Sequence, residues 1–131
     1  MREQILKEYF DGTISADKLS DDLIATVEVK GSIAKHNIIN FKSDTDFVVT
    51  SKHLIQLCKD VLNDKIKLAD METIAFSLRS SDFFTWDSDT IDGGRVDEVI
   101  FNWESPEINT PTTKNYVMVC ATYLETGKNK V

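Results

Sequence analysis

Residues 51–80 read SKHLIQLCKDVLNDKIKLADMETIAFSLRS, and their apolar side chains recur with the period of an α-helix. Between Ser51 and Leu62 these side chains fall at i, i+3, i+4, i+7 and i+8, which places them on one face. Asn63-Asp64 ends that helix, and a second stripe over residues 70–80 begins with acids, which the helix dipole favours at an N-terminus. The stretch therefore predicts two consecutive amphipathic helices. The outer face of the first is expected to carry Lys52, Lys59 and Asp60.

The same spacing predicts helices on both sides of this pair. On the N-terminal side, residues 2–10 form one helix that stops at Asp11-Gly12, and a second begins after Ser15 as N-cap. On the C-terminal side, Gly93-Gly94 turns the chain into a helix over residues 95–104, whose apolar stripe includes Trp103 as a core residue. A last helix, capped by Thr112 or Thr113, follows the loop closed by Pro111 and runs to Gly127.

Between residues 25 and 50 the period changes. Val27 and Val29 alternate with polar residues before Gly31-Ser32, and the later runs 37–41 and 47–50 are rich in β-branched and aromatic residues. A small antiparallel β flap with a turn over residues 43–46 fits this pattern, and an irregular loop has much the same composition. The fold class predicted is mainly α, a single helical domain of five or six short helices, with this flap as an addition.

The composition is that of an ordinary globular protein. With 131 residues, 41% hydrophobic and 28% charged, the chain is expected to form a single domain over residues 1–131. It contains no long apolar run, so we expect a cytoplasmic protein with no membrane contact. A pI near 4.7 with scattered basic residues argues against nucleic acid as a ligand. Cys58 and Cys120 lie among apolar neighbours in predicted helices, where a thiol behaves as a small hydrophobe.

The charge of the chain is concentrated in residues 82–107. This stretch holds eight acids and one base, so it carries the whole formal net charge of −7, and both tryptophans lie in it. A local negative field beside amphipathic rings is suited to binding a basic macromolecule. The candidate partner-binding residues are Trp86, Asp87, Asp89, Asp92, Asp97, Glu98 and Glu104.

Among the aromatics of this stretch, Trp86 is flanked by Thr85 and Asp87 in a loop and is the one best placed to be exposed. Phe83 and Phe84 are adjacent, so they cannot face the same way, and one of them is expected to pack inward.

The sequence contains few residues or motifs that are typical of a catalytic site or a metal site. His36 and His53 are the only histidines, and no zinc, phosphate-loop or serine-hydrolase motif occurs. Counting Asp87 as the first position of an EF-hand loop matches Asp89 and Glu98, but Asp92 then stands where the loop requires glycine. We therefore expect no catalytic residue, no resident metal and no cofactor, and calcium binding stays as an alternative.

In size, acidity, helical character and its acidic-aromatic cluster over residues 82–107, the chain resembles the bacterial immunity proteins that neutralise nuclease toxins of the colicin or contact-dependent-inhibition kind. It is longer than the colicin DNase immunity proteins and carries the strand-like segment 25–50. The resemblance implies a stoichiometric inhibitor of a basic toxin domain. A helical adaptor without catalytic activity is the other alternative, and it would show an exposed apolar patch away from the acidic stretch.

Overall fold

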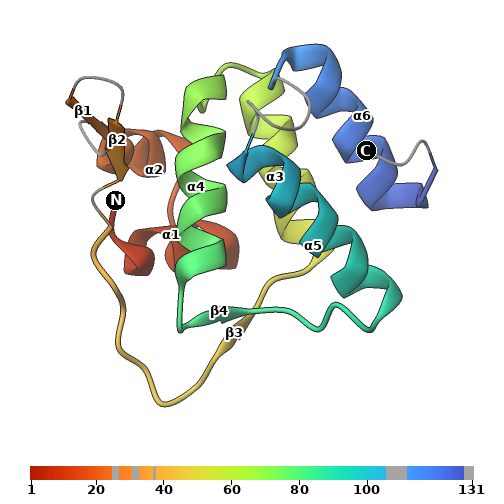
Figure 1. Cartoon of the computed structure of the whole chain (residues 1–131), viewed down its shortest axis with the longest axis horizontal. Helices are drawn as coiled ribbons and strands as arrows, with labels where there is room; N and C mark the ends of the chain where they lie inside the picture. Colours follow the sequence, from red (N-terminus) through yellow and green to blue (C-terminus); the bar gives the residue numbers. More distant parts are fainter. Residues whose placement is uncertain (25–26, 31–32, 37, 106–111, 129–131) are drawn as a thin grey trace.

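The structure is a computed structural model that describes residues 1–24, 27–30, 33–36, 38–105 and 112–128 (Figure 1). The loop predicted to close at Pro111, and Glu107 of the acidic stretch, lie outside these residues. Within them the chain is mainly helical, as predicted. The helices are α1 (Glu3–Asp11), α2 (Ala16–Leu23), α3 (Ser51–Leu62), α4 (Leu68–Ser80), α5 (Ile91–Glu104) and α6 (Lys114–Thr126).

The pair predicted from residues 51–80 is the centre of the fold. Helix α3 packs mainly against α6, and α4 mainly against α5, so these four helices form one body with α1 and α2 beside it (Figure 1). The stripes meet in a single cluster of buried side chains, and Trp103 of α5 is fully buried in it, as predicted. Other members of the cluster are Leu54, Leu57, Ile74, Leu78, Val99, Ile100 and Val117.

Helix ends follow the predicted stop signals. Gly12 after α1 and Gly127 after α6 both have positive φ, at 79° and 76°, where a side chain on Cβ would be strained. Thr113 is the N-cap of α6, and its hydroxyl accepts a hydrogen bond from the backbone N–H of Tyr116 at 3.2 Å.

The prediction for Asp60 is wrong. Its carboxylate is buried, although its position lies outside the apolar stripe of α3. The phenol of Tyr9, on α1, donates a hydrogen bond to it, and Gln56 donates a second at 3.1 Å. Helix α1 therefore covers a face of α3 that the local periodicity assigns to solvent. Two donors satisfy the carboxylate that this docking buries.

The β flap is confirmed in part. Strands β1 (Val27–Lys30) and β2 (Ile33–His36) pair antiparallel, with Val27 opposite His36. The later runs do not join them. Strand β3 (Phe47–Val48) instead pairs in parallel with β4 (Phe84–Thr85), far along the chain, and Ile39 makes an isolated parallel bridge with Arg2. Residues 43–46 therefore do not connect two strands of one flap.

Phe83 and Phe84 are both buried, which corrects the expectation that only one packs inward. The two rings meet each other at 5.0 Å and both contact the ring of Phe47, but each also has a partner of its own. The ring of Phe83 meets that of Phe41 edge to face at 5.0 Å, and the ring of Phe84 meets those of Phe10 at 6.0 Å and Phe47 at 5.5 Å. Because rings from α1 and from the 38–48 region pack against this segment, both adjacent phenylalanines are buried.

Candidate functional site

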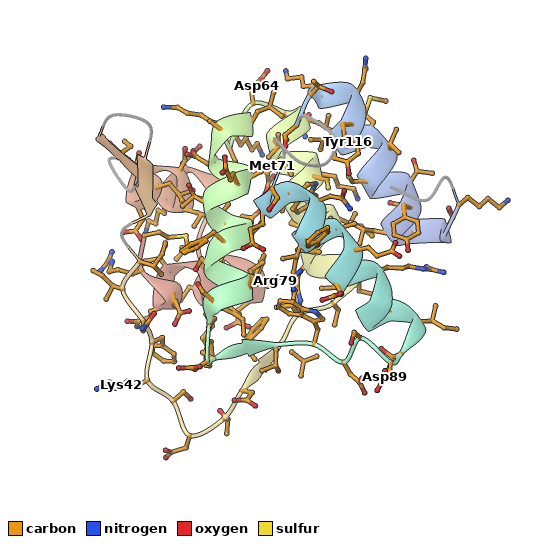
Figure 2. All side chains as sticks on the ribbon, in the orientation of Figure 1. Lys42, Asp64, Met71, Arg79, Asp89 and Tyr116 are labelled. Carbon is orange, nitrogen blue, oxygen red and sulfur yellow. The ribbon has the colours of Figure 1, made fainter. Side chains whose placement is uncertain are left out.

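The loop between β4 and α5 forms one corner of the molecule, and Asp89 lies at its outer edge (Figure 2). The carboxylate of Asp87 accepts a hydrogen bond from the backbone N–H of Asp89 at 2.9 Å, which closes a tight turn. The Thr90 hydroxyl donates to the carbonyl of Asp87 at 2.7 Å and accepts from the N–H of Gly93 at 2.9 Å. Thr90 is thus the N-cap of α5, and the helix begins at Ile91.

The predicted helix start at residue 95 is therefore wrong by one turn. Gly93 and Gly94 lie inside the first turn of α5 and do not form the turn that precedes it. A Cβ on Gly93 would stand 1.8 Å from the carbonyl oxygen of Asp87, so the loop packs onto the helix where only glycine fits. This packing holds the acidic loop against its own helix.

Asp92 connects the start of α5 to the start of α3. Its Oδ2 accepts a hydrogen bond from the backbone N–H of Ser51, the first residue of α3, at 3.1 Å. The carboxylate also lies in the first turn of α5, near the positive end of that helix dipole. Asp92 therefore has a structural task, and it remains exposed.

Asp97 and Glu104, predicted as contact residues, are paired with one arginine of α4. The guanidinium of Arg79 lies 3.2 Å from Glu104 and 3.9 Å from Asp97, and it stands 5.8 Å from the centre of the Phe101 ring. Asp97 also accepts a hydrogen bond from the indole N–H of Trp86 at 3.1 Å. Trp86 is half-buried and packs against the edge of the core, so it is neither the fully exposed aromatic that was expected nor a core residue.

Glu98 is held by the last helix. Its Oε2 accepts a hydrogen bond from the phenol of Tyr123 on α6 at 2.6 Å. Burial, this hydrogen bond and the charge of Glu98 raise the pKa of the Tyr123 phenol to about 12. Of the candidate residues, Asp97, Glu98 and Glu104 are thus engaged with neighbouring side chains.

The acids that remain on the corner lie close in sequence to one exposed apolar side chain. Ile91, the first residue of α5, is 80% exposed and is flanked in sequence by the exposed residues Asp89 and Asp92. We call Asp87, Asp89, Ile91 and Asp92 the acidic tip. The sequence analysis did not name Ile91 as a contact residue, because its candidates were chosen by charge and Trp86 was the one aromatic added to them. Thr90 as an N-cap residue, with Asp92 in the turn that follows, is the signal that would have moved the helix start.

The EF-hand spacing does not assemble a cluster of ligands. Glu98 is bound to Tyr123 and Asp92 to the Ser51 N–H, so neither carboxylate turns toward Asp87 and Asp89 in a shared site. In the part of the chain that the structure describes, no group of three or more His, Cys, Asp or Glu side chains is placed to hold a metal ion.

His53 is part of a helix cap. The Nδ1 atom of His53 accepts the backbone N–H of Thr50 at 2.9 Å, and its ring packs against Phe10 and Phe47. Burial lowers the pKa of His53. Because the cap uses Nδ1 as an acceptor, this side chain supports the start of α3.

None of the described helices is long and apolar enough to cross a lipid bilayer. Comparison of the chain with models of protein families, with characterised protein sequences and with solved structures finds no match.

Proposed function

We propose that the protein is an inhibitor of the immunity type, which binds a basic protein, a nuclease toxin domain, through the acidic tip. The acidic stretch accounts for the whole net charge of −7, so attraction toward a basic surface is directed at one region of the molecule. The substrate cleft of a nuclease is lined with basic groups that bind phosphates. The tip carboxylates would take the place of those phosphates and close the cleft.

The exposure of Ile91 carries the proposal. An isoleucine that is 80% exposed, in a segment whose acids Asp89 and Asp92 are also exposed, fits an interface centre in which an apolar anchor has a polar rim. The two parts have separate effects on binding. Rim charges mainly change the rate of association, and a buried anchor mainly changes the rate of dissociation.

The role of the engaged acids differs from that of the tip. Asp97, Glu98 and Glu104 are held by Arg79 or Tyr123, so we expect them to add to the long-range field more than to direct contacts. Asp87 and Asp89 accept no hydrogen bond from another element in the described structure, so their outward oxygens can meet a partner. Five of the seven candidates therefore divide into a contact group, Asp87 and Asp89, and a field group, Asp97, Glu98 and Glu104.

A charge-removing variant tests the proposal against a basic toxin domain encoded next to this chain. Asp87→Asn, Asp89→Asn and Asp92→Asn together remove three charges, and each Asn can still accept the hydrogen bonds that hold the turn and the start of α3. We expect the association rate to fall by about tenfold at low salt and the toxin to escape inhibition. We expect Ile91→Ser to speed dissociation instead.

The matched control removes three exposed acids on other elements, by Asp17→Asn, Asp44→Asn and Glu125→Gln. It has the same net charge as the tip variant, so a purely global charge effect would slow association equally. Circular dichroism melts confirm that both variants are folded. If the tip variant and Ile91→Ser both bind and inhibit like the original protein, the proposal is wrong.

An adaptor role has one observation in its favour. Met118 and Val119 on α6 are 57% and 40% exposed, and they lie away from the acidic tip. If this surface carries the function, Met118→Ser with Val119→Ser abolishes partner binding, and the tip variant leaves it unchanged. The calcium alternative is tested by thermal melts with and without millimolar calcium, because an ion that binds only the folded state raises the melting temperature.

A further inference from the structure

A small pocket lies where the N-terminal end of α1, the chain after Ile39 and the start of β4 come together. Its volume is about 290 Å³. The chain after Ile39 is fixed there by two backbone hydrogen bonds, from Glu3 N–H to Ile39 C=O and from Ile39 N–H to Met1 C=O, both at 2.9 Å. The residues lining the pocket are Glu3, Asn40, Phe41, Lys42, Ser43, Asp82 and Phe83.

Glu3 is the unusual member of this lining, because its side chain is charged and the residue is only 1% exposed. Its Oε1 accepts the backbone N–H of Phe41 at 2.8 Å, which holds the carboxylate beside the pocket wall. Its Oε2 is buried and has no hydrogen-bond partner within the described residues. A buried carboxylate oxygen without a donor is costly, so a ligand that donates to it has much to gain.

The surroundings favour a positive ligand. Glu3 opens α1, where the positive end of the helix dipole favours negative charge, and Asp82 adds a second, exposed carboxylate to the same pocket. Lys42 also lines the pocket, but its side chain extends away from the body of the molecule in Figure 2. The chain's own ammonium group therefore does not fill the space between the carboxylates.

The apolar part of the wall is aromatic. The rings of Phe41 and Phe83 meet edge to face, with centroids 5.0 Å apart and planes at 74°. Aromatic faces attract ammonium and guanidinium groups, and they also cover the methylene stem that carries such a group. At about 290 Å³ the pocket is at the small end of ligand sites, suited to a single side chain or a small amine.

We propose that this pocket binds an alkylammonium or guanidinium group, which the Glu3 carboxylate attracts through its unpartnered charge and which is flanked by Asp82 and the two phenylalanine rings. An anion would meet two carboxylates, and the described residues offer no third acidic, His or Cys ligand for a metal ion. The inference concerns Glu3 and Asp82, which are not part of the acidic tip, so it stands or falls separately from the inhibitor function.

The test is a titration of the full chain, ¹⁵N-labelled, with N-acetyl-lysine amide and N-acetyl-arginine amide. N-acetyl-norleucine amide, which has a similar shape and no charge, is the matched neutral probe. We expect saturable shifts of the Phe41 and Phe83 amide signals with the charged probes only. Glu3→Gln keeps an acceptor for the Phe41 N–H and is expected to weaken binding at least about tenfold.

Two surface variants keep the test decisive if Glu3→Gln fails to fold. Asp82 is exposed, and Asp82→Asn should weaken binding by about two- to fivefold. Asp44→Asn, on the adjoining loop and outside the pocket lining, is the control and should leave binding unchanged. Lys42→Gln removes a competing charge and should strengthen binding. Equal shifts with the neutral probe, or binding that is indifferent to Asp82→Asn and Lys42→Gln, would overturn the proposal.

A further arm identifies the source of the cation. The free diamine 1,5-diaminopentane carries the same ammonium group without a peptide backbone. Tighter binding of the diamine than of N-acetyl-lysine amide would indicate a small amine, and the reverse order would indicate a lysine or arginine side chain of another protein. Both orders support cation binding. Failure of every charged probe to shift the Phe41 signal contradicts it, whatever the toxin experiments show.

Discussion

The contrast between two neighbouring glycines in α5 is the sharpest test of the loop geometry. Gly93 and Gly94 lie next to each other in the first turn of the same helix. A Cβ on Gly93 would stand 1.8 Å from the carbonyl oxygen of Asp87 and 2.8 Å from the hydroxyl of Thr90. A Cβ on Gly94 would meet only the carbonyl oxygen of Ser88 at 3.4 Å, an ordinary contact. Alanine should therefore act in opposite directions at the two positions.

The magnitudes follow from three effects. Alanine in a helix is favoured over glycine by about 0.8–1 kcal/mol, and this gain applies at both positions. At Gly93 the overlap with backbone costs about 1–3 kcal/mol, because the loop must move away. That movement also disturbs the Thr90 cap, at about 1 kcal/mol. The free energy of unfolding should thus fall by about 1–3 kcal/mol for Gly93→Ala and rise by about 0.5–1 kcal/mol for Gly94→Ala.

Urea denaturation followed by circular dichroism at 222 nm and by tryptophan fluorescence measures both variants. The two tryptophans, Trp86 beside the loop and Trp103 in the core, report on the loop and on global unfolding. A shift of the midpoint with an unchanged slope identifies a change of stability. If Gly93→Ala is as stable as Gly94→Ala, the loop does not pack on α5 as described, and Asp87 is not held against the start of that helix.

Further predictions concern buried polar and thiol groups. Tyr9→Phe should lower the free energy of unfolding by about 1–3 kcal/mol, because Asp60 loses one of its donors, and urea denaturation measures this loss. Burial lowers the pKa of folded His53, so the unfolded chain binds its proton at higher pH than the folded one. The cap's contribution to stability should then be complete above about pH 6.5 and decline below it, and His53→Gln should flatten that dependence in denaturation curves. Burial raises the pKa of the Cys58 and Cys120 thiols, so both should resist iodoacetamide at pH 8 until the protein is unfolded in urea. Rapid modification of the folded protein would contradict their burial.

The sequence predicts which acidic residues make up much of the candidate site, but it does not predict which side chains they interact with. The concentration of acids over residues 82–107 is visible in the chain alone, and so is the position of Asp87 and Asp89 in a loop. The partners of Asp97 and Glu98 are not visible there, because Arg79 and Tyr123 belong to helices that approach α5 only after the chain has folded. The pocket at Glu3 was equally hidden, since its residues are separated by up to 80 positions.

The sequence by itself determined the helices, because an amphipathic stripe is written in residues three and four positions apart and needs no distant partner. It determined the caps at Gly12 and Gly127 for the same local reason. The tertiary structure alone decided that Asp60 is buried and that Phe47–Val48 pairs with Phe84–Thr85. Those contacts depend on which faces of the helices pack together, and the shape and burial of whole surfaces decide this. Neither of the two segments in such a contact specifies it through its local sequence pattern.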